Sequence, residues 1–251
     1  MLKDPILDGL NDRQKEAVLH FETPLLVLAG AGSGKTKVIT HKIMYLVKSL
    51  GIPIHRILAI TFTNKAAEEM KERVEKALGE RPQWVMTFHS FAAKFLRFEA
   101  EKVGYDRNFV IYDEDDSKKL IKKVLKDLNL NEELIKPDKV KDYISKIKQE
   151  DNPEEYLDLL SFSVPHIRQI YERYEEELKN SNAFDFDDLL VKSVKILKNN
   201  PDILQRWQNK FDYILVDEYQ DTNKVQHQLL KLLVGSRNTI TVVGDPAQCI
   251  Y

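Results

Sequence analysis

The chain has 251 residues, of which 43% are hydrophobic, so it can bury a sizeable core as one large domain or as a domain carrying a second one. No stretch approaches the roughly 18 apolar residues of a membrane span, and the first residues lack the apolar core of a secretory signal, which leaves a cytoplasmic location as the default. The single cysteine, Cys249, excludes an internal disulfide and a cysteine-based zinc site, and the net charge of -2 gives no overall attraction to nucleic acid.

Five short apolar runs are typical of buried parallel strands. They occupy residues 25–28, 57–60, 84–86, 213–216 and 239–243. A helical pattern follows the first run from Thr36, and after the second run apolar residues recur four apart from Ala66 to Leu78. This alternation predicts an α/β fold, a doubly wound parallel sheet with helices on both faces.

The centre of the chain has a different pattern. Residues 93–182 contain one glycine, Gly104, and their apolar residues recur at helical spacing throughout. We therefore expect an all-helical subdomain at 93–182, inserted into a sheet domain formed by residues 1–92 and 183–251. The apolar stripes of these helices are most simply the subdomain's own core.

A glycine-rich run links the first predicted strand to the first long helix. It consists of Ala29, Gly30, Ala31, Gly32, Ser33, Gly34, Lys35 and Thr36. Such a run lets the backbone fold around phosphates, with N–H groups and a helix N-terminus aimed at the anions. Lys35 would neutralise the β- and γ-phosphates, and the Thr36 hydroxyl would ligate Mg²⁺. Ala29 replaces the first glycine of the strict pattern, and an ordinary strand-to-helix turn is the alternative, but the Lys-Thr ending favours ATP with Mg²⁺.

Two acidic residues at the end of another predicted strand supply the carboxylates that the glycine-rich run lacks. Asp217 and Glu218 come directly after the apolar run at 213–216. A carboxylate at the carboxyl end of a neighbouring parallel strand can hold Mg²⁺, which we assign to Asp217. Glu218 can then position and deprotonate the attacking water. Alone, the pair could be a solvated acidic turn; with the phosphate loop in the same chain, we expect an ATPase site.

Short segments elsewhere in the chain indicate what the ATPase drives. They read LNDRQKEA at 10–17, AGAGSGKT at 29–36, TFTNKAA at 61–67, TFHSFA at 87–92, FDFDDL at 184–189, VDEYQDTN at 216–223 and VGDPAQCIY at 243–251. In this order they resemble the motifs of UvrD/Rep/PcrA-type DNA helicases of superfamily one. The resemblance implies a RecA-like P-loop ATPase domain that couples ATP hydrolysis to movement on single-stranded DNA and to unwinding of duplex DNA, in repair or replication.

The resemblance also implies roles at the nucleotide. Gln14 would read the adenine edge, because an amide both donates and accepts hydrogen bonds. Gln248 would sense the γ-phosphate during catalysis, and Gln220 would lie beside the Mg²⁺ and the water. Without the resemblance, Gln220 and Gln248 could be simple surface amides. Lys37 stands where many relatives have an arginine that packs on adenine, and lysine lacks the planar guanidinium for stacking.

For DNA, the resemblance implies a face at the ends of two strands. Single-stranded DNA would cross Phe62, Thr63, Asn64, Thr87 and His89, and Tyr251 would stack on a base. Residues just after parallel strands gather at one sheet edge, and aromatic rings stack on bases without demanding sequence. Core packing is the alternative for Phe62, and loop capping is the alternative for His89. For Phe184 and Phe186, core packing and DNA contact both remain open.

Relatives of this type continue with a second motor domain, whose arginines reach across to the γ-phosphate. We therefore expect these 251 residues to be monomeric, to bind ATP with Mg²⁺ weakly, to hydrolyse it slowly and not to unwind DNA alone. DNA, single-stranded and duplex, would be the partner of the full-length protein. The alternatives are a nucleotide- or partner-binding platform without turnover and the motor part of a helicase-nuclease subunit.

Overall fold

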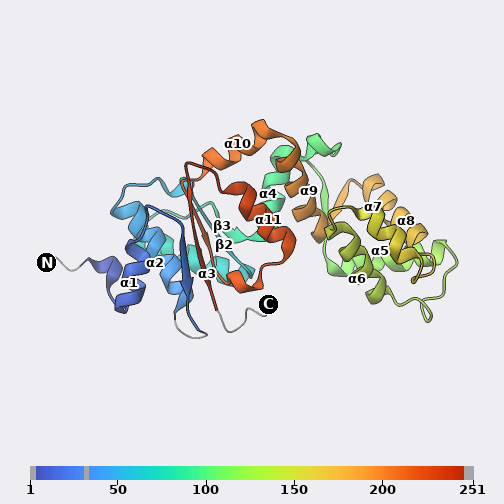
Figure 1. Ribbon diagram of the computed structural model, residues 1–251, viewed down its shortest axis with the longest axis horizontal. Coiled ribbons are helices and arrows are strands. Elements are labelled where there is room, and N and C mark those ends of the chain that lie inside the picture. Colours follow the sequence, from blue (N-terminus) through green and yellow to red (C-terminus); the bar gives the residue numbers. More distant parts are fainter. Residues whose placement is uncertain (1–3, 31–33, 246–251) are drawn as a thin grey trace. The chain divides into compact units, whose positions relative to one another are not determined.

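The structure is a computed structural model that describes residues 4–30 and 34–245 (Figure 1). The chain divides into two compact units. Unit 1 comprises Met1–Phe91 and Leu197–Tyr251, and unit 2 comprises Ala92–Ile196. Within the described ranges, no helix has both the length and the apolar character to cross a membrane.

Unit 1 is built on a five-stranded parallel sheet with the strand order β1-β7-β6-β2-β3. The strands are β1 (Leu25–Leu28), β2 (Ile57–Thr61), β3 (Val85–Thr87), β6 (Tyr213–Val216) and β7 (Thr239–Gly244). Every expected strand of this sheet is present, because each apolar run pairs with a neighbouring strand. β2, which has neighbours on both sides, is buried along its whole length. At the edge, β1 leaves Leu26 and Leu28 exposed.

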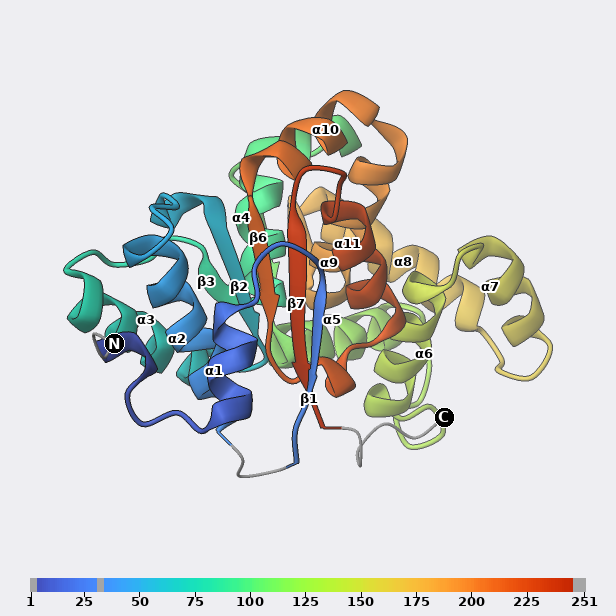
Figure 2. The same ribbon diagram turned by 60° about the vertical axis from the view of Figure 1, so that its left-hand side comes forward.

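Helices cover both faces of this sheet, which confirms the predicted α/β fold. Figure 2 shows α2 and α3 on one side of the strands and α10 and α11 on the other. The elements of unit 1 are α1 (Asp12–Leu19), α2 (Lys35–Lys48), α3 (Asn64–Leu78), α10 (Pro201–Lys210), α11 (Lys224–Leu233) and the short helices η1 (Pro5–Leu7), η2 (Ile54–Arg56) and η4 (Tyr219–Asp221). Two further helices, α4 (Phe88–Glu99) and α9 (Phe186–Asn199), run from one unit into the other.

The core of unit 1 holds α2 against the sheet. Ile39, Ile43 and Leu46 of α2 are buried with Leu215 of β6 and Val243 of β7. Full burial of such a side chain stabilises the fold by roughly 1.5–3 kcal/mol. Because the last two residues of the glycine-rich run, Lys35 and Thr36, form the start of α2, this packing fixes where the run ends relative to the strands.

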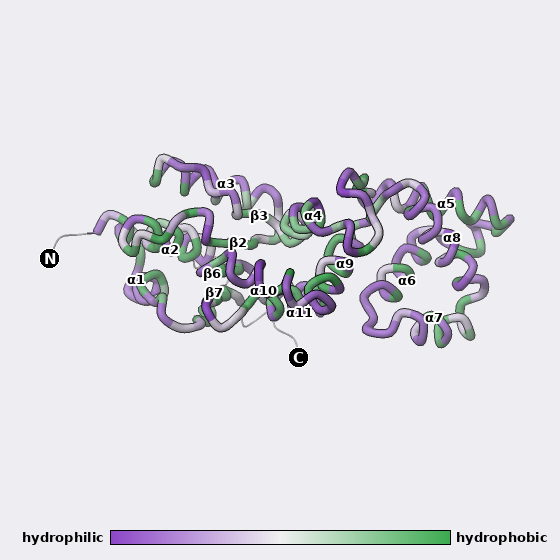
Figure 3. The backbone as a smooth tube through the Cα atoms, turned by 90° about the horizontal axis from the view of Figure 1, so that it is seen from above, coloured by the Kyte–Doolittle hydropathy of each residue, from purple (hydrophilic) through white to green (hydrophobic). Residues whose placement is uncertain are grey.

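Unit 2 is mainly helical. It contains η3 (Ala100–Val103), α5 (Glu114–Asp127), α6 (Pro137–Gln149), α7 (Pro153–Ser161) and α8 (Ile167–Asn180). In Figure 3, α5 and α8 alternate between hydrophilic and hydrophobic along their length, whereas β2 and β7 are mostly hydrophobic. That alternation places one face of each helix in the core, where Ile121, Val124, Ile144 and Tyr174 are buried.

Unit 2 also differs from the all-helical subdomain expected from the sequence. Its strands β4 (Val110–Tyr112) and β5 (Ala183–Asp185) form a two-stranded parallel sheet, with Val110 opposite Ala183. Each strand has only three residues, too short for a period to be recognised in the sequence. This pairing keeps residues 183–196 with unit 2, whereas the sequence analysis assigns residues from 183 onward to the sheet domain.

Candidate functional site

The candidate site lies at the carboxyl edge of the sheet in unit 1. Because all its strands are parallel, their carboxyl ends share one edge, where ligands of open α/β sheets bind. The strand order divides this edge into two parts. The adjacent strands β1, β7 and β6 end at the residues expected to bind ATP, and the adjacent strands β2 and β3 end at those expected to contact DNA.

The glycine-rich run leaves β1 and enters α2 through Gly34. Ala29 N donates to Gly244 O at 3.0 Å, so the pairing of β1 with β7 extends into the run. Gly34 has φ +77°, in the left-handed region that glycine adopts without strain. A Cβ atom at Gly34 would lie 2.8 Å from Gln14 Nε2, so the Gln14 amide would have to move to make room for it.

Gly34→Ala should therefore weaken ATP binding at least about tenfold, since alanine is strained at this φ and its Cβ would displace the Gln14 amide. Titration with a fluorescent ATP analogue measures the effect. Gly79→Ala is the matched control, because Gly79 has φ +73° and open space around the missing Cβ. Both variants carry the backbone penalty, but only Gly34→Ala must displace the Gln14 amide. Equal affinities of the two variants for ATP would contradict the close approach of Gln14.

Thr36 and Asp217 meet although 181 positions separate them in the sequence. The Thr36 hydroxyl donates to Asp217 Oδ2 at 3.0 Å. Asp217 is 2% exposed, and its N–H donates to Ile60 O at 3.0 Å, which anchors it beside β2. Burial raises the pKa of Asp217, while the hydrogen bond from Thr36 acts in the opposite direction. A hydroxyl and a carboxylate oxygen together are a donor set that suits Mg²⁺ with nucleotide phosphates.

Glu218 directly follows Asp217 at the end of β6, and its N–H donates to Asp217 Oδ1 at 2.9 Å. Its backbone is left-handed, with φ 53° and ψ 42°, which is strained for a residue with a side chain. The carboxylate lies 3.7 Å from Lys35 Nζ and accepts a hydrogen bond from the Gln220 amide. Gln220 Oε1 in turn accepts from Asp245 N at 2.9 Å, at the end of β7. One amide thus ties the carboxyl ends of β6 and β7 together.

Gln14 and Lys37 both lie near Gly34 at the entry to α2, and each is hydrogen-bonded within the chain. Gln14 forms a capping box at the start of α1, where its Oε1 accepts from Asn11 N at 2.9 Å. Lys37 Nζ donates to Gly9 O at 2.8 Å, so its ammonium is held by the N-terminal segment. An interaction of either side chain with a base stays a prediction.

The residues expected to contact DNA gather after β2 and β3. Phe62 is half-buried and packs edge-on against Phe88, with ring centroids 5.4 Å apart. Thr63 is exposed and caps α3, since its hydroxyl accepts from Ala66 N at 3.0 Å. Asn64 is also exposed.

After β3, the side chains are less accessible. Thr87 is buried, and its hydroxyl both accepts from Ser90 N and donates to Ser90 Oγ, which caps the first turn of α4. His89 is partly exposed. The exposed contact positions of this face are therefore on the β2 side.

Several expected site residues lie outside the described ranges. They are Ala31, Gly32, Ser33, Gln248 and Tyr251. Phe184, for which two roles were open, is fully buried in unit 2 with its ring centroid 4.3 Å from that of Tyr105 and 4.8 Å from that of Phe109. Core packing is thus the role of Phe184. Asp245 and Lys42 were not predicted from the sequence, because an acidic residue after a strand and a lysine within a helix carry no signal of their long-range contacts.

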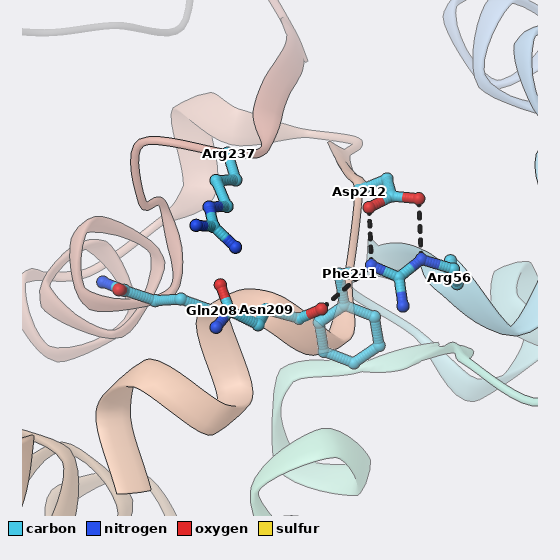
Figure 4. Close-up of a pocket in the computed structure, with 6 residues that line it drawn as sticks. All are labelled: Arg56, Gln208, Asn209, Phe211, Asp212 and Arg237. Atoms are coloured by element: carbon cyan, nitrogen blue, oxygen red, sulfur yellow. Dashed lines mark hydrogen bonds and ion pairs between the residues drawn. The ribbon is translucent and has the colours of Figure 1, made fainter. Parts of the chain in front are cut away.

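A surface pocket of about 150 Å³ lies at the opposite, amino edge of β2 and β6 (Figure 4). Arg56 binds Asp212 with two hydrogen bonds of 2.7 Å, from Nε and from Nη2. Arg56 precedes β2 and Asp212 precedes β6, so this pair fastens the two strands where they begin. None of the sequence-predicted site residues lines this pocket.

The chain was compared with known proteins. The family described as the UvrD/REP helicase N-terminal domain matches residues 10–251. A protein named ATP-dependent DNA helicase PcrA, from Staphylococcus aureus, is 44% identical over 98% of this chain. Its counterpart of the same name from Staphylococcus epidermidis is also 44% identical over 98% of the chain. The chain spans 34% of the length of each of these relatives.

Proposed function

The chain belongs to the UvrD/REP helicase family, and on that premise we propose that it is the ATP-binding half of a DNA-translocating motor. The observation that carries this proposal is the hydrogen bond between Thr36 and Asp217. It joins the residue that ends the phosphate loop to the carboxylate at the end of β6, where nucleotide-bound Mg²⁺ needs its protein ligands.

Each residue of the edge has a role in this proposal. The backbone from Ala29 to Gly34 surrounds the phosphates, and Lys35 neutralises their charge. Thr36 and Asp217 hold Mg²⁺, which when bound spreads the developing charge of the β- and γ-oxygens.

The attacking water binds next to Glu218, at the carboxyl end of β6. Glu218 accepts its proton, and Gln220 holds the Glu218 carboxylate in place. Gln14 reads the base, and Lys37 lies on the base side of the site. Gln248, beyond the described residues, is the proposed γ-phosphate sensor.

We assign single-stranded DNA to the neighbouring part of the edge. Thr63 and Asn64 are exposed at the end of β2, where they can contact a sugar–phosphate backbone, and the half-buried Phe62 can offer part of its ring to a base. Thr87 and His89 support this surface from β3, and Tyr251 would extend it. The proposed face is continuous with the ATP edge because β2 is the neighbour of β6.

The whole protein would use this half together with a second motor domain. Its partners are single-stranded and duplex DNA, its location is the cytoplasm, and its cycle consists of closing and opening around ATP. The 251 residues alone correspond to about a third of the curated relatives. We therefore propose that they are monomeric, bind ATP with Mg²⁺, turn it over slowly and separate no strands by themselves.

Phosphate release with and without single-stranded DNA tests this proposal. The wild-type chain should release phosphate slowly and faster with DNA, whereas Glu218→Gln should bind ATP normally and lose at least about 100-fold in rate, because the proton acceptor is gone. Glu72→Gln, an exposed position on α3, is the matched control. ATP binding without any turnover would favour a nucleotide-binding platform, and strand separation at the rate of a full-length relative would contradict the assignment to one motor half.

A further inference from the structure

Three basic side chains of α2 bind main-chain carbonyl groups of the N-terminal segment. Lys37 Nζ donates to Gly9 O at 2.8 Å. His41 Nδ1 lies in close contact with Ile6 O, and Lys42 Nζ donates to Ala17 O at 2.9 Å. Lys42 Nζ also donates to the carbonyl of His20. One helix thus holds a segment that includes the whole of α1.

Lys42 is the most buried member of this set. Its side chain is 1% exposed, and no carboxylate in the part of the chain that the structure describes forms an ion pair with it. Burial lowers the pKa of Lys42 to about 8, so the ammonium is still mainly charged at pH 7. Its acceptors are the last carbonyls of α1, which carry the negative end of the helix dipole. Desolvating an ammonium that has only main-chain acceptors costs free energy, and the resulting hydrogen bonds fix the position of α1.

The opposite end of α1 carries Gln14. Its Oε1 accepts from Asn11 N at 2.9 Å, and Asn11 Oδ1 accepts from Gln14 N at 2.8 Å. This capping box sets the direction of the amide, and Gln14 Nε2 comes within 2.8 Å of the place that a Cβ of Gly34 would occupy. A carbonyl oxygen has two lone pairs, so the bond from Asn11 N does not by itself exhaust the acceptor capacity of Oε1.

We propose that Lys42 is a positioning residue for base recognition, which locks the helix bearing Gln14 to the helix that begins at the phosphate loop. The inference rests on the proposed ATP site. Since α2 starts at Lys35, the phosphates and the base are then read from two helices held as one rigid piece. A shift of α1 by even a fraction of an ångström would misplace the amide without affecting the phosphate contacts.

The test compares three ligands, ATP, GTP and inorganic tripolyphosphate, each titrated with Mg²⁺ against the 251-residue chain. Lys42→Met keeps an unbranched side chain that is one atom shorter and removes its donors. Lys48→Met, exposed in the last turn of the same helix, is the control. We expect the preference for ATP over GTP to fall about tenfold in Lys42→Met, with tripolyphosphate affinity unchanged within about twofold. Lys48→Met should match the wild type.

The possible results of this titration distinguish failure of the proposed ATP site from failure of the positioning role of Lys42. If the wild type binds neither ATP nor tripolyphosphate, the proposed function itself fails. If the wild type prefers ATP and Lys42→Met keeps that preference, the ATP site stands and the positioning role is overturned. A parallel loss of affinity for all three ligands would also overturn it, since that result indicates a general structural defect. Should Lys42→Met fail to fold, Lys42→Gln removes the charge and shortens the reach, and the same comparison applies.

Discussion

Lys35→Ala should reduce ATP hydrolysis by at least about 100-fold, because it removes the only side-chain cation that the described structure brings to the end of the phosphate loop beside Glu218. The side chain is 8% exposed, and its Nζ lies 3.7 Å from Glu218 Oε2. A cation in such a partly desolvated place stabilises developing phosphate charge far more than it would in water. Phosphate release at saturating ATP measures the loss of rate.

Two comparisons make this result specific to the proposed site. Lys48→Ala, on the exposed end of the same helix, should retain wild-type turnover. The unfolding midpoint of Lys35→Ala should stay close to that of the wild type, because its ion-pair partner Glu218 is 36% exposed and such pairs contribute little. Turnover by Lys35→Ala within a few-fold of the control would remove the phosphate loop from the proposed mechanism.

Lys148→Ala should lower the free energy of unfolding by about 3–5 kcal/mol, the largest effect on stability that we expect in unit 2. Lys148 Nζ is buried within α6 and lies 2.6 Å from Glu175, 2.9 Å from Asp185 and 3.0 Å from Asp188. The Tyr174 hydroxyl also donates to Asp185 at 2.7 Å. Removing the Lys148 cation leaves the buried Asp185 and Asp188 carboxylates without the positive charge that lies closest to them.

The loss should depend on pH. Burial raises the pKa of Asp188 to about 7, against roughly 3.9 in an unfolded chain, so the folded state holds that proton more tightly. The contribution of Asp188 to stability therefore falls as pH rises from about 4 to about 7. Burial also opposes ionisation of Asp185, but the charge and hydrogen bond of Lys148 outweigh it and lower that pKa to about 2. Without Lys148, the ionised carboxylates of Asp185 and Asp188 repel each other with no nearby cation to compensate them. This repulsion is greatest when both groups are ionised, so the loss of stability in Lys148→Ala should be smaller at pH 5 than at pH 8.

Chemical denaturation followed by far-UV circular dichroism measures this deficit at the two pH values. Lys146→Ala, at an exposed position of α6, is the matched control. Hydrogen exchange should increase in peptides from α6 and α8 of Lys148→Ala, with peptides from α2 as the internal reference. A variant as stable as Lys146→Ala at pH 8 would show that the buried cluster contributes nothing to unit 2.

The five-stranded sheet was predictable because each of its strands is a short apolar run in the sequence, and the inner strand β2 is buried along its whole length. The short strand β5 was not, since Ala183–Asp185 pairs only with β4, a partner more than seventy positions away. The same segment explains the acidic run at 184–189. Lys148 pairs with Asp185 and Asp188, and Lys141 with Asp187. These carboxylates thus form ion pairs that connect α6 with the segment 185–188 inside unit 2.

For the candidate site, the sequence motifs predicted which residues take part, but not the contacts that those residues make with distant segments. The run ending in Lys35 and Thr36 and the pair Asp217 and Glu218 each follow a strand, and parallel strands bring such ends to one edge. The structure places Thr36 beside Asp217 and Lys35 beside Glu218. The link from Gln220 to Asp245 and the burial of Lys42 depend on tertiary packing between segments, for which a single sequence has no periodic signal.

A crystal structure of the chain with Mg²⁺ and a non-hydrolysable ATP analogue tests the central claim most directly. We predict phosphates against the backbone of residues 30–34, the Mg²⁺ between the Thr36 hydroxyl and Asp217, and the base within hydrogen-bond reach of Gln14. A nucleotide bound elsewhere, such as the amino edge beside Arg56 and Arg237, would contradict the claim. Absence of bound nucleotide at millimolar concentration would contradict it equally.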